Sequence, residues 1–482
     1  MEIFEKILKR FFWVPLIMGT IGYYLAGEKG FWHCLYASIA CYFVNPVNDL
    51  DNPLIITSKI LAVVVTTGVV LSILGSVFTA IMRFFKRFSS DATVIYGDSE
   101  YGKHLAEKLR HGYHIDDATE FEKVRDHILM YEHDTDALRF LEQNKENIKD
   151  KNVYLILDKA DTFLLSDTAG TGIHYQSIAE ICARRFWREY SLYNHVVTEN
   201  KPAKIAFIGM GPIGYALFRY GYLNNLYTTT QHIEYHIYGA DIATKGEINR
   251  LEMVNDDKII CHEEDYFESP DVSKMDYIIV TPLSTNKIFN LSCDAEDMTM
   301  ILSRLLRIAS DARIFLYEEG SLKYEDIYAS DRIVTFGDVS KFLTEDNIKN
   351  EPLDRAAKLF NYDYELRASG THATDDYKEK AEECWKKLNG FFRGSNVARA
   401  DHHFIEMRRE EEGANDHEIW SVEHTRWCRY YYINGWSYDA KRDNAKKKHP
   451  LLVPYEELEF AEQQKDGIYD QRIKEEIEGI CK

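Results

Sequence analysis

The chain has 482 residues, of which 45% are hydrophobic and 28% charged, so it has room for two or three domains with buried cores. Its net charge of −20 at pH 7 argues against a nucleic acid as the principal partner, because phosphate binding needs clustered Lys and Arg. The eight cysteines are scattered, without a Cys-x-x-Cys pair or a His/Cys cluster at zinc spacing, so we expect reduced thiols and no metal site.

Three apolar stretches lie in the N-terminal part. Residues 11–26 follow a basic segment, and residues 60–82 contain no charged side chain and precede a second basic segment. As a helix, the latter stretch would be ~34 Å long and would cross a hydrocarbon core of ~30 Å. This pattern predicts two spans of a cell (inner) membrane, with both termini in the cytoplasm. Residues 31–44 are too short to span it and predict a re-entrant helix enclosed by protein.

Residues 1–88 resemble the pore module of two-span potassium channels. Ser38 matches the serine of that family's pore helix, and Gly68 lies within one residue of its hinge glycine. The resemblance implies a gate hinge at Gly68 and Gly75, where a long helix can bend. The predicted pore residues stand where the family has its Thr-Val-Gly-Tyr-Gly filter and the aspartate that follows, and they are Val44, Asn45, Pro46, Val47, Asn48 and Asp49.

The altered filter argues against potassium selectivity. Both filter glycines are absent, and Pro46 fixes φ near ~−65° and lacks an N–H, so a ladder of inward-facing carbonyl groups is not expected. The amides of Asn45 and Asn48 would line a wider, hydrated passage, and the acidic residues around it favour cations. The alternative is a pore-derived anchor that conducts nothing.

A first Rossmann-like domain is predicted over residues 89–200. A buried strand at 92–97 leads through a turn with Gly97 and Gly102 into a helix, but Ser99 stands where the middle glycine belongs. Further strands are expected at 127–131 and 153–157, with a helix at 135–144 between them and Glu132 at the position of a ribose-binding acid. We interpret this copy as a degenerate fold kept for packing, and Gly97 and Gly102 as its nucleotide-binding residues if it binds one.

The same plan repeats over residues 201–345, with a complete glycine motif. A strand at 204–209 runs into Gly209, Gly211 and Gly214, which form G-x-G-x-x-G, and a helix follows at 216–223. Glycines in this motif allow a tight turn, a close phosphate approach and helix–strand packing, and the helix N-terminus binds the anion. Asp241 lies just beyond the second strand, 233–238, and further strands are expected at 277–281 and 313–317. We predict that this copy binds a nucleotide or dinucleotide of the NAD or adenine type.

A pore followed by two such units resembles channels gated by RCK domains of the TrkA-N class. The resemblance covers residues of about 90–345 at the level of fold. It implies a ring, here a homotetramer, that binds a nucleotide-derived ligand and pulls on the inner helix. A membrane-tethered NAD(P)-dependent oxidoreductase is the alternative reading of the same glycines. Because we find no separate catalytic domain and no acid/base pair, we expect no enzymatic activity.

The last part divides into a helical connector, residues 346–414, and a terminal domain, residues 415–482. The connector has helical stretches at 353–366 and 375–388. The terminal domain resembles the ryanodine-receptor repeat, the RyR domain, in its Gly-Trp, Arg-Asp, His-Pro and Val-Pro-Tyr signatures. The resemblance implies a sensor of nucleotide-derived ligands. Stacking aromatic and anion-binding side chains make up its predicted pocket, namely Arg426, Trp427, Trp436, Arg442, Asp443, His449 and Tyr455. The competing interpretation places the tryptophans in the core of a small helical domain.

The sequence therefore predicts a membrane α-helical pore followed by α/β tandem Rossmann-like domains and a small, mainly α RyR domain. The predicted function is a ligand-gated cation channel, which by family resemblance would suit a bacterial stress or antiviral effector. A non-conducting, membrane-anchored nucleotide sensor is the alternative.

Overall fold

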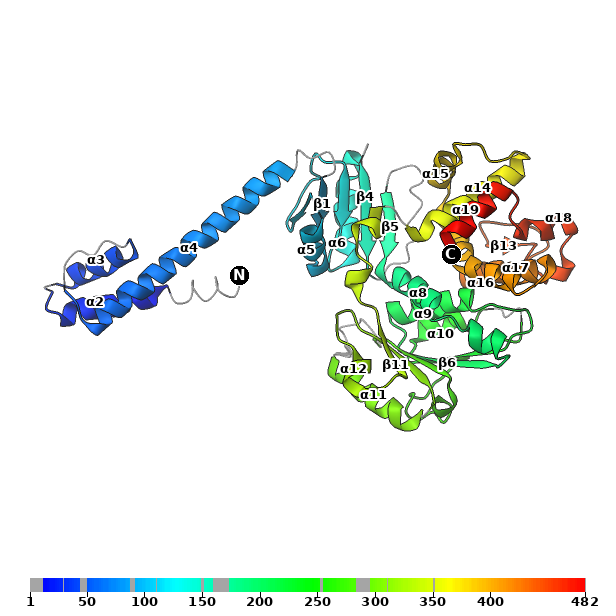
Figure 1. The fold of residues 1–482 in the computed structure, drawn as a ribbon, viewed down its shortest axis with the longest axis horizontal. Helices are drawn as coiled ribbons and strands as arrows, with labels where there is room; N and C mark the ends of the chain where they lie inside the picture. Colours follow the sequence, from blue (N-terminus) through cyan, green and yellow to red (C-terminus); the bar gives the residue numbers. More distant parts are fainter. Residues whose placement is uncertain are drawn as a thin grey trace. The chain divides into compact units, whose positions relative to one another are not determined.

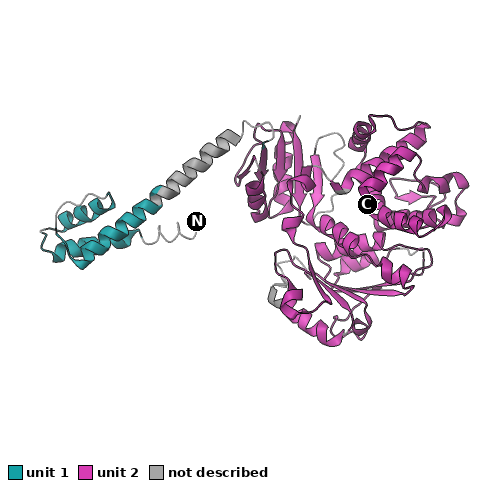
Figure 2. Cartoon of the chain, in the orientation of Figure 1, with its two compact units in different colours: residues 1–92 teal, residues 93–482 magenta. Residues whose placement is uncertain are grey.

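The computed structural model divides into two compact units, Met1–Ala92 and Thr93–Lys482 (Figure 2). Within them, the side chains of residues 69, 71–86, 295–297 and 353 are not described. The residues that the structure describes are 12–28, 30–43, 50–86, 92–109, 111–148, 151–158, 173–251, 255–282, 295–309, 311–349 and 352–481.

The described residues of the first unit include the helices α2 (Trp13–Leu25), α3 (Phe31–Tyr42) and α4 (Pro53–Lys86) (Figure 1). They pack closely where small residues meet, since a Cβ on Gly19 would lie 2.6 Å from Oγ of Ser58 and 2.8 Å from Oγ of Ser38. Both serines are buried and donate hydrogen bonds to backbone carbonyl groups: Ser38 to Cys34, one turn earlier in α3, at 2.8 Å, and Ser58 across to Pro15 of α2 at 2.6 Å.

Among the described residues, no helix has both the length and the apolar character that crossing a membrane requires. α2 has 13 residues, ~20 Å of helix, and α3 has 12, so both fall well short of a bilayer core of ~30 Å. The described side chains of α4 include Thr57, Ser58 and Lys59, and residues 71–86 lie outside them. The predictions of a membrane-spanning pore, a cation channel, a membrane-anchored sensor and a multi-pass membrane protein are therefore wrong.

The predicted pore and hinge residues lie partly outside the described part of the chain. Residues 44–49, the predicted replacement for the filter, are all outside it. Gly75 is in α4, but its surroundings are not described. Gly68 is half-buried within α4.

Thr93–Lys482 begins with a parallel five-stranded sheet in the order β2-β1-β3-β4-β5. This is the 2-1-3-4-5 order of a doubly wound α/β fold. Glu132 follows β3 rather than the second strand, because the short β2 was not recognised in the sequence; its predicted place beside a ribose is therefore wrong. The elements are β1 (Thr93–Tyr96), α5 (Glu100–Lys108), β2 (Gly112–Ile115), β3 (Asp126–Leu129), α6 (Asp134–Gln143), η1 (Lys145–Asn147), β4 (Asn152–Leu157) and β5 (Ile173–Ser177).

A second parallel sheet has six strands in the order β11-β10-β9-β6-β7-β8. Read from β8, this is the 3-2-1-4-5-6 order of the dinucleotide-binding fold. Its elements are η2 (Asn194–Thr198), β6 (Ala203–Ile208), α9 (Pro212–Asn224), β7 (Ile233–Tyr238), α10 (Ile242–Ile248), β8 (Lys258–Cys261), η3 (Val272–Lys274), β9 (Tyr277–Val280), α11 (Ala295–Ile308), β10 (Arg313–Tyr317), α12 (Tyr324–Tyr328) and β11 (Ile333–Phe336).

Two segments connect the sheets, because each follows one sheet in sequence and packs against the other. The helix that follows the first sheet, α8 (Ile178–Glu189), packs along α9, and Nε1 of its Trp187 donates a 2.7 Å hydrogen bond to the carbonyl of Leu217. In return, η5 (Val339–Lys341) and α13 (Glu345–Lys349) follow the second sheet but bury Val339 and Ile348 in the core of the first. The sheets therefore share their hydrophobic covering.

The C-terminal region is mainly helical and packs on the second sheet through α9 (Figure 1). Two long helices, α16 (Gly390–Glu411) and α17 (Asp416–Ile433), make this contact. The remaining elements are η6 (Pro352–Asp354), α14 (Arg355–Ser369), α15 (Tyr377–Lys387), β12 (Ser437–Tyr438), β13 (Lys448–His449), η7 (Tyr455–Glu457), α18 (Phe460–Gln463), η8 (Gln464–Asp466) and α19 (Gln471–Cys481).

Candidate functional site

The turn between β6 and α9 can be built only with glycine at two of its positions. Gly209 has φ of 95°, and a Cβ there would overlap the carbonyl oxygen of Thr281 at the end of β9. A Cβ on Gly214 would overlap the carbonyl oxygen of Gly209. Oγ1 of Thr281 donates a 2.8 Å hydrogen bond to that same carbonyl, which holds the turn against β9.

This turn lies at the point where the strand order reverses. β6 has β7 on one side and β9 on the other, and ligands of doubly wound sheets bind in the crevice at the carboxyl ends of these strands. Gly211 is the N-cap of α9, with extended backbone angles, and the first bond of the helix runs from the N–H of Tyr215 to the carbonyl of Gly211 at 2.9 Å. The earlier N–H groups have no acceptor within the helix, so they are available to an anion.

Asp241, the predicted ribose-binding acid, is exposed and lies three residues after β7. Its carboxylate is the N-cap of α10 and accepts a 2.7 Å hydrogen bond from the N–H of Thr244, which lowers the pKa of the carboxyl group. The acid is therefore ionised and held in place at the edge where the ribose of a dinucleotide binds.

The corresponding turn of the first sheet differs in charge. Gly97 also has a positive φ, 115°, but the atoms nearest to a Cβ on Gly102 would be side-chain atoms of Ile95, Met130 and His114, at 3.3, 3.6 and 3.7 Å. Oδ1 of Asp98 accepts a 2.9 Å hydrogen bond from the N–H of Glu132, which bridges the crevice between β1 and β3 with a carboxylate. A negative charge at this position opposes phosphate binding.

In the C-terminal region, aromatic rings gather around His449. Its ring centroid lies 5.1 Å from that of Trp427 and 6.3 Å from that of Trp436. Tyr431 contacts all three rings, and Phe391 from α16 stacks on Trp436 at 5.3 Å. Trp436 and His449 are buried, and Trp427 is half-buried, so the rings pack chiefly on one another.

Two arginines of α17 are fully buried and paired. Arg426 donates hydrogen bonds from Nε and Nη2 to both carboxylate oxygens of Glu423, at 2.7 and 2.8 Å. Arg429 contacts Oδ2 of Asp257 at 2.6 Å and donates to the carbonyl of Tyr222, at the end of α9, at 2.8 Å. The contacts of Arg429 join the C-terminal region to the second sheet, whereas the pair of Arg426 and Glu423 lies within α17.

Comparison with known proteins identifies this region. Residues 402–481 match the RyR domain family. No curated protein and no solved structure matches the chain. The predicted RyR resemblance is therefore confirmed, with its start at 402 instead of 415, whereas the potassium-channel and TrkA-N resemblances have no such support.

The predicted pocket residues of the RyR domain lie in two different environments. Arg442 and Asp443 are on the surface side, where Nε of Arg442 donates to Asn444 at 2.9 Å and Asp443 lies 3.7 Å from Lys446. The others, including Tyr455, are buried or half-buried, and Arg426 already has a carboxylate partner. The structure thus brings Trp427, Trp436 and His449 together but separates Arg426 from Arg442; the pocket as a ligand site stays a prediction.

A cleft of about 850 Å³ at the edge of the RyR domain was not recognised in the sequence. Its positive side chains are Arg185 and Arg188 of α8 and Arg355 of α14, and α19 supplies Glu475 and Glu476. Nε of Arg185 is buried without a hydrogen-bond partner among the described residues, and burial, with Arg184 and Arg188 nearby, lowers the pKa of this guanidinium. Only folding brings these three helices together, so no sequence motif marks the cleft.

Proposed function

We propose that this chain is a nucleotide-binding protein and that an adenine nucleotide or dinucleotide binds at the turn between β6 and α9. The observation that carries the proposal is the three-glycine turn at the reversal of strand order, directly before the N-terminus of α9. Backbone N–H groups there would receive the phosphates, because a helix N-terminus carries partial positive charge and unpaired donors.

The position of Asp241 supports a ligand that contains ribose. Its carboxylate follows the second strand of the sheet, where the fold places the acid that accepts a hydrogen bond from a ribose hydroxyl. We propose that the chain binds this ligand without transforming it. Turnover of a nicotinamide cofactor would instead favour the oxidoreductase alternative.

The expected test is loss of binding in Gly211→Val. The backbone of Gly211, at φ −66° and ψ −176°, suits any residue, so the variant should fold while its side chain blocks the approach of phosphate. Losing two charge-assisted hydrogen bonds, at ~1.5–3 kcal/mol each, corresponds to ~100-fold weaker binding or more. Calorimetric titration of the full chain with AMP, ADP, ATP and NAD measures this.

Ser99→Ala is the matched control in the first sheet. Ser99 occupies the equivalent position before α5, and its side chain makes no capping hydrogen bond there, so the change should leave both folding and binding unaltered. Equal affinity of the wild type and Gly211→Val for every nucleotide would contradict the assignment.

The arginine-lined cleft is a second candidate for an anionic ligand, because Arg185 has a buried donor without a partner among the described residues. Arg188→Gln distinguishes the two sites. If this variant loses nucleotide binding and Gly211→Val retains it, the ligand binds between α8, α14 and α19.

We also propose that the chain forms a homo-oligomer, a tetramer in its predicted form, through the first unit. Each of its helices bears exposed apolar side chains at helical spacing, and contiguous apolar surface of this kind marks an interaction site. On α2 these are Trp13, Ile17, Ile21 and Tyr24; on α3 and just after it they are Trp32, Tyr36, Ile39 and Phe43; and on α4 they include Ile56, Ile60 and Val63.

Light scattering after size exclusion tests this association. The full chain should elute at a multiple of 56.2 kDa, and Ile17→Glu combined with Ile21→Glu should reduce the measured mass, because buried charge opposes the contact. A control, Lys59→Gln on the same unit, removes one partly exposed charge without adding a new one and should retain the oligomer. A wild-type mass of 56.2 kDa would refute the proposal.

A further inference from the structure

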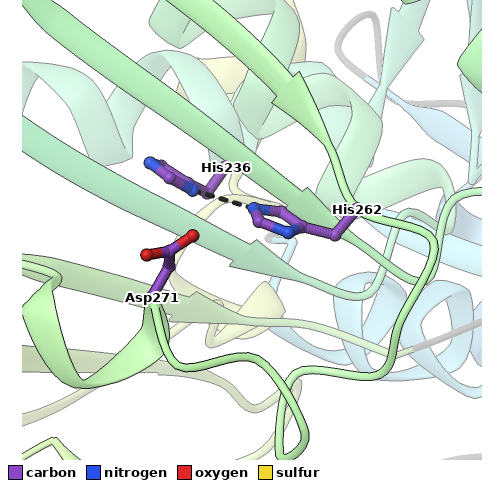
Figure 3. Close-up of side chains that lie close together, drawn as sticks. All are labelled: His236, His262 and Asp271. Atoms are coloured by element: carbon purple, nitrogen blue, oxygen red, sulfur yellow. Dashed lines mark hydrogen bonds between the residues drawn. The ribbon is translucent and has the colours of Figure 1, made fainter.

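Two buried histidines and an aspartate converge at the edge of the second sheet (Figure 3). His236 is in β7, His262 follows β8 directly, and Asp271 precedes η3. One potential ligand atom from each residue lies within 4.8 Å of the other two. The histidines are 4% and 6% exposed at their side chains, so water has little access to either ring.

Strand register fixes the two rings side by side. His236 is opposite Ile260 in the β7–β8 ladder, so His262, two residues further on, lies on the same face of the sheet. The N–H of His262 continues the ladder to the carbonyl of Ile237 at 2.9 Å. Tyr238 stacks on the ring of His262 with centroids 4.2 Å apart, which restricts its rotation.

The outward nitrogen of each ring faces a glutamate. Nδ1 of His262 lies 3.0 Å from Oε1 of Glu264, and Nε2 of His236 lies 3.5 Å from Oε2 of Glu234. Metal-binding histidines almost always present their second nitrogen to a carboxylate or carbonyl in this way, which fixes the tautomer and makes the facing nitrogen more basic.

The two rings face each other through one nitrogen each. Nδ1 of His236 and Nε2 of His262 are 2.8 Å apart, a hydrogen-bond distance. One neutral ring donates to the other across this distance, so one proton lies between the two nitrogens. A cation could replace that proton if His236 carried its proton on Nε2, facing Glu234; both facing nitrogens would then be ligands, and the carboxylate of Asp271 would supply a third.

We propose that His236, His262 and Asp271 bind a first-row divalent transition metal ion of the zinc class. Imidazole and carboxylate ligands suit such ions, and bonds of ~2.0–2.2 Å would place the three ligand atoms ~3.4 Å from one another. The two nitrogens, 2.8 Å apart in the structure, would move slightly apart, and Asp271 would move closer. Asp271 now pairs with Lys274 at 2.8 Å, but this is a partly exposed pair within one turn and is readily displaced. The site is independent of the proposed nucleotide site.

A second cluster, His402, Glu406 and Glu423, has similar spacing but different electrostatics. Both carboxylate oxygens of Glu423 already accept hydrogen bonds from Arg426, and Nε2 of His402 lies 2.6 Å from the carbonyl of Leu226. The carboxylate of Glu423 is therefore already engaged by a buried arginine, whereas Asp271 pairs with the exposed Lys274, which makes the cluster around His236 the better cation site.

The proposal is tested with Zn²⁺ and Co²⁺ on the full chain after treatment with a chelator. We expect one ion per chain by calorimetry and visible d–d absorption for bound Co²⁺. Asp271→Asn removes a ligand from a half-exposed position, so the protein should fold and bind Co²⁺ at least ~10-fold more weakly, with an altered spectrum. Glu264→Gln, which acts through His262, should weaken binding ~10–100-fold.

The adjacent Glu263→Gln is the matched control, because Glu263 is exposed and pairs with Lys245 instead. It should leave the affinity and the Co²⁺ spectrum unchanged. Absence of stoichiometric binding, or equal affinity and spectra in the wild type, Asp271→Asn and Glu264→Gln, would overturn the proposal.

Discussion

Replacing Arg429 by Met is expected to lower the free energy of unfolding by ~3–5 kcal/mol, because it leaves the buried carboxylate of Asp257 without its cation. Both side chains of this ion pair are fully buried. Asp257 also accepts hydrogen bonds from Gln231 and from the N–H of Ile233, which fix it beside Arg429. Urea unfolding of the full chain, followed by tryptophan fluorescence, measures the change.

Arg442→Met is the control within the same RyR domain. Arg442 is exposed and bonds to Asn444 near it in sequence, so its replacement should change stability by no more than ~0.5 kcal/mol. Adding Asp257→Asn to Arg429→Met should cost less than the sum of the single changes, since the double variant contains no unpaired charge. Similar stability of Arg429→Met and the wild type would show that the buried pair does not hold the RyR domain to the second sheet.

Acid is expected to destabilise the protein through His127 and His449. Burial lowers the pKa of each to about 4, from 6.5. His127 has Nε2 2.9 Å from the carbonyl of Val124, and Nδ1 of His449 accepts the N–H of Leu451 at 3.1 Å. Between pH 6.5 and 4 the unfolded chain binds protons that these buried rings do not, so stability is present above pH 6.5 and falls as the pH decreases.

Between pH 6.5 and pH 5, protonation of the unfolded chain at each of these positions should lower the free energy of unfolding by about 2 kcal/mol, at ~1.36 kcal/mol per pH unit. The measurement is the difference in unfolding free energy between the wild type and His127→Gln, or His449→Gln, at pH 7 and pH 5. Differences between variants are required because the carboxyl groups of Asp466 and Glu319 have a raised pKa and titrate in the opposite sense. A difference that does not change with pH would contradict the assignment for that ring.

The helix α9 borders the candidate nucleotide site at one end and contacts the RyR domain at the other. Its N-terminus at Gly211 borders the candidate nucleotide site, and near its C-terminal end the carbonyl of Tyr222 accepts a hydrogen bond from Arg429 of the RyR domain. Arg219 adds a 3.3 Å hydrogen bond to Asn434. The RyR domain is therefore attached to the same helix that would bind the phosphates.

Local sequence patterns were sufficient for the central strands and the glycine turn. The strands at 233–238 and 313–317 were predicted with the bounds that the structure gives, because both are short stretches rich in β-branched and aromatic residues. Gly209 and Gly214 were recognisable from the G-x-G-x-x-G spacing, and the structure gives the reason for that spacing, since their neighbours leave no room for a Cβ. By contrast, β2 is a four-residue strand with a polar histidine, and periodicity does not reveal it.

Tertiary structure alone decided what the apolar and charged side chains contact. The apolar runs at 11–26 and 31–44 were predicted to be a membrane span and a re-entrant helix, but their helices have 13 and 12 residues and pack on α4. Arg426 was predicted to bind phosphate, whereas its charge is compensated by Glu423 one turn earlier. His236 and His262 are 26 residues apart in sequence and meet because strand register places them on one face. Sequence spacing records neighbours along the chain, while such contacts depend on how strands and helices pair in space.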